Sequence, residues 1–311
     1  MVEPLLPSGE EAPPEPHPLL GYAMVLTAAT LWAVNGTVSK IILDTGVSSP
    51  RLTEVRSTGA FLGLAAAVAL LNPRSLRISR RELPLLAVFG VCGLAFVQWF
   101  YFAAIHRIAI GVALLIQYLA PLIVALWARF AMHRPVRRRI WAALALALVG
   151  LSFVLELWSG FELDGLGVAA SLLAAASYAA YVLLAEREVG RRDPISLTTY
   201  GFLFATLFWA LVQPWWSFPF GELDDAAGAA WSLPVWALIA WMIALGTILP
   251  FGLMIAALRF VSAPRASIIA MLEPVAATVV AWLWLGETLG PAQLGGGALV
   301  LAGIVLAQSA R

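Results

Sequence analysis

The stretch AAGAAWSLPVWALIAWMIALGTILPFGLMIAAL, from Ala226 to Leu258, is the longest part of the chain without a charged residue. A helix that crosses a bilayer needs roughly 20 apolar residues in a row. The stretch does not alternate between polar and apolar positions, as the strands of a membrane barrel would. Because backbone polar groups in lipid must be satisfied within the segment itself, the stretch predicts a transmembrane helix.

The rest of the chain has the same character. Of its 311 residues, 61% are hydrophobic and 12% are charged, and the mean hydropathy is +0.89. Soluble domains carry roughly 25% charged residues, so a water-soluble globular protein is excluded. The formal net charge of +1 offers no basic surface for nucleic acid. The single cysteine, Cys92, excludes an internal disulfide and a cysteine-based metal cluster.

Similar apolar runs recur along the sequence, and turn signals such as Asn72-Pro73 and Gly290-Pro291 separate them. They predict an all-α membrane protein. Its ten transmembrane helices are expected at about 19–41, 52–71, 84–105, 112–132, 140–158, 166–185, 196–213, 234–257, 266–285 and 291–309. Residues 1–18 are rich in proline and glutamate and predict a disordered cytoplasmic tail.

The distribution of arginine predicts the orientation, because basic residues resist translocation more than acidic residues do. Arginines collect in the even-numbered loops and at the C-terminus, whereas acidic residues such as Glu162, Glu222, Asp224 and Asp225 lie in odd-numbered loops. The basic set is Arg74, Arg77, Arg80, Arg81, Arg134, Arg137, Arg138, Arg139, Arg187, Arg191, Arg192, Arg259, Arg265 and Arg311. We therefore expect a multi-pass plasma-membrane protein with both termini in the cytoplasm.

The sequence also indicates an internal duplication of residues 19–158 in residues 165–309. A shift of 146 positions places Trp32 on Tyr178 and Asn35 on Tyr181, and a shift of 153 places Pro121 on Pro274. Each half holds five predicted spans. Since five is odd, the second half must enter the membrane in the opposite orientation, and inverted repeats of this kind place a binding site where the halves meet.

Several motifs follow one another in a specific order. They are Gly21, Trp32-Ala-Val-Asn-Gly36, Arg56, Met271-Leu-Glu-Pro-Val-Ala-Ala277, Leu285-Gly-Glu-Thr-Leu289, Gly295 and Gly303. With these motifs the chain resembles the drug/metabolite transporter superfamily, and within it the EamA family. The first half departs from the pattern, since Arg134 occupies the position that matches Glu287. The resemblance implies two inverted five-helix repeats and secondary transport of small metabolites, often the export of amino acids.

Glu273 is the clearest candidate for a functional residue. An ionisable group at membrane depth costs several kcal/mol unless it is paired or hydrated. Its carboxyl group either takes and releases a proton during transport, or holds a substrate ammonium group, or forms a structural ion pair with Arg56 or Arg265. Arg56 itself lies near the outer end of the second span, where its side chain can reach the interface as an anchor.

Other polar and aromatic residues near mid-membrane are candidates for substrate binding. Interhelical hydrogen bonding and ordinary packing are the alternative roles for all of them. An amphiphilic solute would fit a cavity lined by such residues. They are Trp32, Asn35, Gln98, Trp99, Tyr101, Gln117, Tyr178 and Tyr181.

These features favour a secondary transporter that exports amino acids or similar amphiphilic metabolites by alternating access. A uniporter or channel-like pathway without proton coupling is the first alternative, and a non-transporting scaffold is the second. No enzyme is expected, because the sequence lacks paired aspartate motifs, a GxSxG elbow and an HExxH motif. No metal and no cofactor are expected. The expected partners are a small-molecule substrate, the lipid bilayer and, if Glu273 couples transport, protons.

Overall fold

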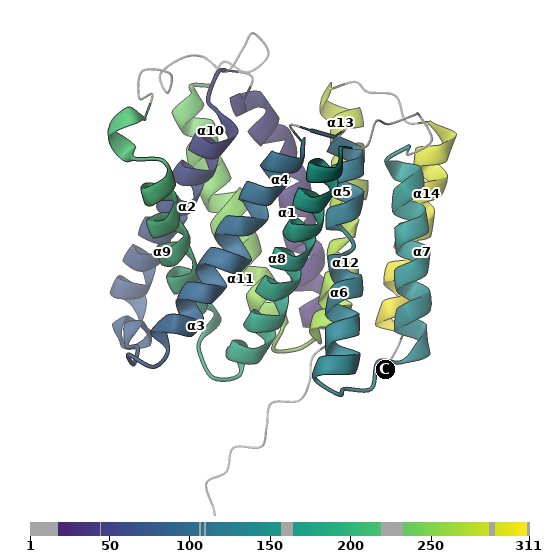
Figure 1. Cartoon of the computed structure of the whole chain (residues 1–311), viewed down its shortest axis with the longest axis horizontal. Coiled ribbons are helices and arrows are strands. Elements are labelled where there is room, and N and C mark those ends of the chain that lie inside the picture. Colours follow the sequence, from purple (N-terminus) through teal and green to yellow (C-terminus); the bar gives the residue numbers. More distant parts are fainter. Residues whose placement is uncertain are drawn as a thin grey trace, which may run out of the picture.

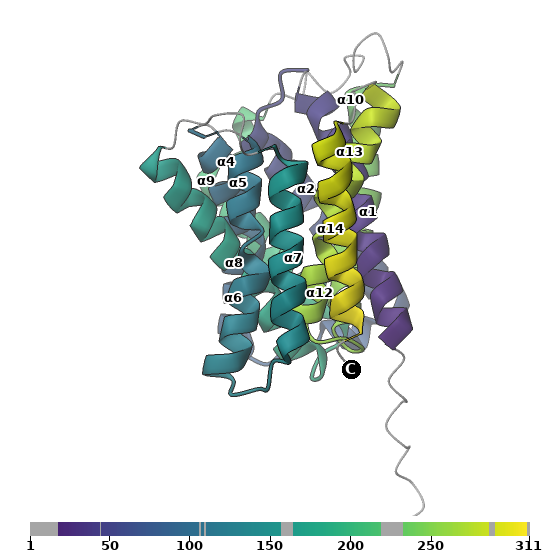
Figure 2. The same cartoon turned by 90° about the vertical axis from the view of Figure 1, so that its right-hand side faces the viewer.

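The computed structural model describes residues 18–43, 45–105, 107–108, 110–156, 164–218, 233–285 and 290–309. In these ranges almost the whole chain is helical, and the helices stand side by side in one bundle (Figures 1 and 2). The predicted tail up to residue 17, the turn around Glu287, the acidic residues Glu162, Glu222, Asp224 and Asp225, and Arg311 lie outside the described residues.

The first half of the chain forms five elements that run between the two ends of the bundle. They are α1 (Pro18–Leu43), α2 (Ser49–Leu71), the continuous run α3 (Leu83–Val88), η2 (Phe89–Ala95) and α4 (Phe96–Ile105), the run α5 (Ile110–Gln117), α6 (Ala120–Leu126) and η3 (Trp127–Ala131), and α7 (Arg138–Val154). A short helical turn, η1 (Pro73–Leu76), follows α2.

The second half repeats this order. Its elements are α8 (Gly165–Val189), α9 (Pro194–Val212), the run α10 (Val235–Ile243), η7 (Ala244–Ile248) and α11 (Leu249–Ala257), the pair α12 (Ala263–Ala270) and α13 (Leu272–Leu285), and α14 (Pro291–Gln308). A turn, η5 (Trp215–Ser217), follows α9. Both η2 and η7 are π-helical, so the third span of each half carries a π-helix at an equivalent place.

Nine helical segments among the described residues are long and apolar enough to cross a membrane. The tenth, α7, has 17 residues, which is at the short end of the length that spans a bilayer. It ends at Val154 rather than continuing to residue 158 as predicted, because the chain turns at Glu156, whose φ is 48°. α7 packs along α14 at one side of the bundle (Figure 1).

The first helix of each half packs against helices of the other half. α1 packs on α11, α12 and α13 of the second half, whereas α8 packs on α4, α5 and α6 of the first half. The two halves are therefore interlocked around a common centre, and they are inverted five-helix repeats as the sequence predicts.

Close contacts of glycines repeat across the two halves. A Cβ atom built on Gly93 in η2 would lie 3.0 Å from the Cα of Tyr181, and one built on Gly246 in η7 would lie 2.0 Å from Oδ1 of Asn35. Gly246 follows Gly93 by 153 positions, and Tyr181 follows Asn35 by 146. The π-helix in the third span of each half thus touches the first helix of the other half, at positions that the duplication relates.

An arginine at each end of the α2–α9 pair ties the two halves together. At one end, Nη1 of Arg51 donates to Oε2 of Glu54 at 2.6 Å and to the carbonyl oxygen of Pro214, beyond α9, at 3.2 Å. At the other end, Nη2 of Arg192 donates to Oε1 of Glu82 at 2.6 Å. The first contact joins α2 to the segment after α9, and the second joins the segment before α9 to Glu82, the residue before α3.

Candidate functional site

The fourth span of each half is broken at the same place. α5 ends at Gln117 and α6 begins at Ala120, while α12 ends at Ala270 and α13 begins at Leu272. Pro121 and Pro274 cause both breaks, because a proline lacks an N–H group and its ring clashes with the carbonyl four residues earlier. Those carbonyls belong to Gln117 and Ala270, the last residues of α5 and α12. The fourth span of each half is therefore an interrupted helix.

Glu273 lies in the first turn of α13, directly after the break. Its carboxyl group accepts a hydrogen bond from the hydroxyl of Tyr118, which lies in the corresponding break of the first half. Tyr101 and Tyr178 are close enough to Glu273 for electrostatic interaction. All four side chains are partly accessible although they lie inside the bundle, so they surround an internal space rather than a closed core.

Arg56 of α2 faces the interior and not the outer interface. Its Nε donates to Oγ1 of Thr247 at 2.7 Å, and its Nη2 donates to the carbonyl oxygen of Gly246 at 3.2 Å. This carbonyl belongs to the π-helix η7, and π-helices often occur at functional sites. Arg56 also interacts electrostatically with Glu273. No direct ion pair joins the two groups in the part of the chain that is described, so they are separated by more than ion-pair distance.

Phe251 of α11 is the centre of an aromatic cluster beside these charges. Its ring lies 5.1 Å from that of Trp32, 5.6 Å from that of Tyr181 and 5.4 Å from that of Phe202. The guanidinium carbon of Arg56 lies 5.7 Å from the same ring. Trp32 of the first half and Tyr181 of the second half thus meet through Phe251, and the cluster forms an apolar wall next to the guanidinium group of Arg56.

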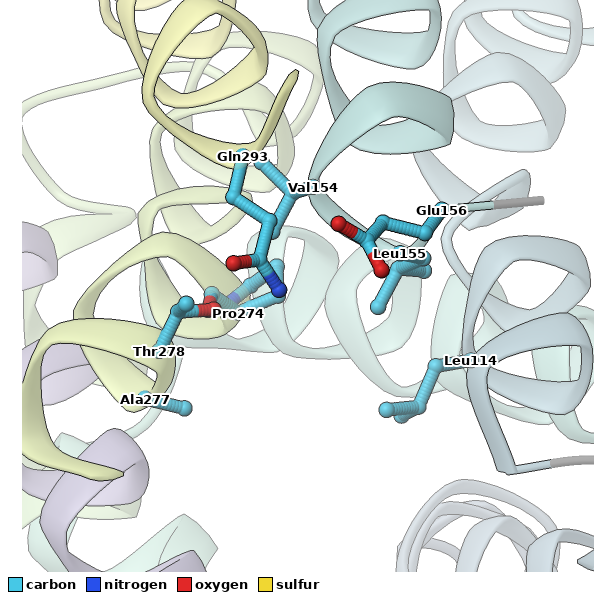
Figure 3. A pocket seen from close by; sticks show the side chains of 8 residues that line it. All are labelled: Leu114, Val154, Leu155, Glu156, Pro274, Ala277, Thr278 and Gln293. Atoms are coloured by element: carbon cyan, nitrogen blue, oxygen red, sulfur yellow. The ribbon is translucent and has the colours of Figure 1, made fainter. Parts of the chain in front are cut away.

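A cavity of about 360 Å³ lies between α5, α7, α13 and α14 (Figure 3). Leu114 and Ala277 are part of its lining. Leu114 precedes Tyr118 by four residues and Ala277 follows Glu273 by four, and residues four apart lie on the same face of a helix. The cavity therefore reaches to within one helical turn of Tyr118 and Glu273, and Pro274, which follows Glu273, is also part of its lining.

The model of one protein family matches the chain twice, at residues 19–156 and at residues 165–308, and it is described as the EamA-like transporter family. The chain belongs to this family. The protein is therefore an integral, multi-pass membrane transporter of a small-molecule substrate, and it is not an enzyme. The two matched segments are the halves that form the inverted repeats.

Relatives of this EamA transporter include the threonine/homoserine exporter RhtA of Escherichia coli K12, which is 31% identical over 263 residues, covering 84% of this chain and 81% of the exporter. An uncharacterized transporter of Archaeoglobus fulgidus is 29% identical over 290 residues, covering 92% of this chain and 96% of the relative. A protein of known crystal structure superposes with a TM-score of 0.76 at 19% identity over 92% of this chain and 96% of that chain. This last similarity shows that the fold is shared.

The structure brings most of the predicted site residues of this EamA transporter together. Tyr101 and Tyr178 lie near Glu273, while Trp32 and Tyr181 join the Phe251 cluster. Several of the predicted residues carry buried polar atoms that have no hydrogen-bond partner among the residues that the structure describes, and such groups are rare. These atoms are Nε1 of Trp32, Oδ1 of Asn35, Oε1 of Gln117 and the hydroxyl of Tyr181.

Gln98 of α4 is partly accessible, as Tyr101 and Glu273 are. One predicted residue is placed differently. Trp99 lies outside the central group, because 41% of it is exposed and its ring packs against Phe208 and Trp209 of α9. Successive helix positions point in different directions, so Trp99 faces outward where Tyr101 faces inward.

Sequence reasoning missed Tyr118, Thr247 and Phe251. Tyr118 had a usable signal, since it stands in the segment that the duplication aligns with Met271-Leu272-Glu273-Pro274. Thr247 and Phe251 lie in an uninterrupted apolar stretch, where only the course of η7 and α11 shows which side chains face the centre. In the described ranges, no group of three or more histidine, cysteine or acidic side chains is arranged to hold a metal ion.

Proposed function

We propose that this EamA transporter exports amino acids or similar small amphiphilic metabolites by alternating access, with Glu273 and Arg56 as the charged groups of the substrate site. The threonine/homoserine exporter of Escherichia coli, with 31% identity, supports a substrate of this class. The paired helix breaks support the mechanism, since interrupted helices near the bilayer midplane hold the substrate in many carriers built from inverted repeats.

One observation carries the proposal: the carboxyl group of Glu273 and the guanidinium group of Arg56 lie near each other inside the bundle, and no ion pair joins them among the described residues. An α-amino acid is a zwitterion and carries both complementary charges. Its ammonium group would bind Glu273 and its carboxylate would bind Arg56, while the aromatic wall around Phe251 would receive the side chain. Charge-assisted hydrogen bonds of this kind are the strong ones in proteins.

Glu273 is also our candidate for proton coupling. A carboxyl group that binds a proton in one orientation of the carrier and an ammonium group in the other would exchange the two during the cycle. A uniporter without this coupling is the alternative mechanism, and a non-transporting scaffold is the alternative function. We further propose that the protein resides in the cytoplasmic membrane with both termini on the cytoplasmic side, because arginines collect at the end of the bundle formed by the even-numbered loops.

Flux in proteoliposomes tests the proposal. Wild-type protein should take up labelled L-threonine by counterflow with saturation, which a channel does not show, and a pH gradient should drive net flux. Glu273→Gln should abolish the pH-driven flux and leave exchange measurable. If both activities are lost in a folded variant, Glu273 contacts the substrate rather than only the proton, and Glu273→Asp should restore part of the binding. Unchanged pH-driven flux in Glu273→Gln would reject the coupling role.

A further inference from the structure

Two polar side chains stand together at one end of the cavity between α5, α7, α13 and α14. They are Glu156, directly after α7, and Gln293, in the first turn of α14, whereas Thr278 of α13 lies beside Ala277 and Pro274. In Figure 3 the carboxyl group of Glu156 and the amide of Gln293 extend toward each other from opposite sides. Toward Tyr118 and Glu273 the lining is apolar, as with Leu114, Leu155 and Ala277.

The hydrogen bonds around these groups decide what they can offer a ligand. Oε1 of Gln293 accepts a hydrogen bond from the backbone N–H of Gly290 at 2.9 Å, which leaves the amide NH₂ group as a donor. The hydroxyl of Thr278 donates to the carbonyl oxygen of Pro274 at 2.8 Å. Glu156 has no ion-pair partner among the residues that the structure describes. One acceptor with a negative charge and one neutral donor thus stand at the same end.

The backbone holds Glu156 in an unusual conformation at this place. Its φ of 48° lies in the left-handed region, which costs a residue other than glycine free energy. A Cβ atom built on Gly290 would lie 3.3 Å from Oε1 of Glu156 and 3.8 Å from Oε1 of Gln293. Gly290 therefore leaves room for both side chains. Strained residues persist where the surrounding structure requires them, which is often at functional sites.

We propose that this cavity is a second amino-acid site, in which Glu156 binds the ammonium group and the Gln293 amide donates to the carboxylate of an α-amino acid. The apolar lining would receive the substrate's side chain. The cavity leads to within one turn of Glu273. The second site is therefore the last place at which an exported substrate binds before it leaves the protein. This inference rests on the proposed function for the direction of movement, but the binding itself is tested separately.

A volume of about 360 Å³ is near the lower end of the range of small-molecule pockets, which suits an amino acid. A lipid chain is the competing occupant, because much of the lining is apolar. A carboxylate and an amide at one end would gain nothing from a hydrocarbon chain, so the polar groups favour the zwitterion.

Protection of a cysteine from modification tests the site in the full-length protein. Cys92 is the only cysteine, so Cys92→Ala with Ala277→Cys puts a single thiol in the cavity. An impermeant thiol reagent is added to proteoliposomes from the outside, with L-threonine or L-threonine amide as competitor. Both competitors should slow the modification. Trp216→Cys, at a side chain that is 89% exposed outside the cavity, is the control position and should show no protection.

Two variants test the binding of the ligand's ammonium group and of its carboxylate separately. Glu156→Gln should raise the concentration for half-protection about tenfold for both L-threonine and its amide, since a charge-assisted hydrogen bond is lost. Gln293→Leu should raise it more for L-threonine than for the amide, because the neutral carbonyl oxygen of the amide is a weaker acceptor than a carboxylate. Protection that is absent, or that Glu156→Gln leaves unchanged, would overturn the inference.

Counterflow measured on the same proteoliposomes distinguishes this result from a failure of the proposed function. Counterflow of L-threonine without protection of the cavity thiol would reject the second site and leave the transport function standing. Protection that depends on Glu156 without any counterflow would support the site and reject the proposed export of amino acids. If vesicle lipid occupies the cavity, the competitors will have no effect, which also rejects the site.

Discussion

The two broken helices have the same backbone and different chemistry. In both, a proline ends one helix and starts the next, and the residue before the proline is Ala120 in the first half and Glu273 in the second. Ala120 is 1% exposed and Met271, the counterpart of Tyr118, is fully buried. Glu273 and Tyr118 are both partly accessible.

The difference between the breaks separates what the repeated prolines determine from what the side chains beside them determine. The repeated prolines place two interrupted helices opposite each other, so the backbone of the site is symmetric. The side chains at the breaks are not, since the first half supplies a hydroxyl donor and the second half supplies the carboxyl group that accepts from it. The symmetric backbone thus carries a single carboxyl group at the breaks, that of Glu273. The guanidinium group of Arg56, from the first half, lies nearby.

The largest effect is expected when the carboxyl group is moved to the other break. Ala120→Glu would put a carboxylate in a fully buried position, and an uncompensated buried charge costs roughly 3 to 5 kcal/mol. We expect this variant to unfold or fail to accumulate, measured by thermal melting and size-exclusion chromatography. Glu273→Ala is the control and should melt within a few degrees of the wild type. An Ala120→Glu protein as stable as the control would show that the two breaks are interchangeable.

The π-helices of the two third spans, η2 and η7, give the next largest contrast. Overpacking costs roughly 1 to 3 kcal/mol, so Gly93→Ala and Gly246→Ala should both lower the melting temperature. At Gly246 the clash is chiefly with the Oδ1 and Cγ atoms of Asn35, at 2.0 and 2.5 Å, whereas at Gly93 it is with the backbone of Tyr181. Asn35→Ala should therefore rescue Gly246→Ala, and Tyr181→Ala should not rescue Gly93→Ala. Equal rescue in both double variants would contradict this account.

The sequence alone predicts the spans and the repeat, because hydropathy and the constant offsets are properties of short segments. Glu273 is found in the same way, since an ionisable residue in an apolar run needs a reason to be there. The orientation of other side chains does not follow. A membrane helix is apolar on the lipid side and on the packed side, so no pattern in the sequence separates Trp99, which faces outward, from Tyr101, which faces Glu273.

Arg56 shows a second reason why the direction of a side chain could not be predicted from the sequence. Its position near the end of a span predicts that the side chain reaches toward the interface. The π-helix η7 instead offers the carbonyl oxygen of Gly246 and the hydroxyl of Thr247 as acceptors, and these draw the guanidinium group inward. A π-helix depends on the packing of neighbouring helices rather than on a local residue pattern, so this outcome could not be predicted from the residues around Arg56.

Substitutions of Tyr118 and Tyr181 should have different, smaller effects on substrate binding. Tyr118→Phe removes the hydrogen bond to Glu273 and should weaken L-threonine binding about tenfold, the effect of losing a hydrogen bond to a charged group. Tyr181→Phe is the matched control, because the Tyr181 hydroxyl has no hydrogen-bond partner in the described ranges of the chain. It should leave binding and stability nearly unchanged. A larger loss in Tyr181→Phe than in Tyr118→Phe would move the substrate site from the break to the aromatic cluster.

The smallest effect concerns the two ends of the α2–α9 pair. At the Glu82 end, hydrogen bonds from the backbone N–H of Ser79 and from Arg192 lower the pKa of Glu82 from its ordinary 4.5 to about 2. A lowered pKa stabilises the fold fully above pH 4.5, and this stabilisation is lost as the pH falls toward 2.

Glu82→Gln should therefore lower the melting temperature at pH 7 by about 1 to 3 °C, and the gap to the wild type should close as the pH falls from 4.5 toward 2. The effect is small because the Glu82 side chain is 41% exposed, where water and salt screen the charge, so 1 M salt should also reduce it. At the other end, the Glu54 side chain is fully buried, and salt should not change the effect of Glu54→Gln. An equal salt response at both ends would show that both arginine contacts are solvated alike.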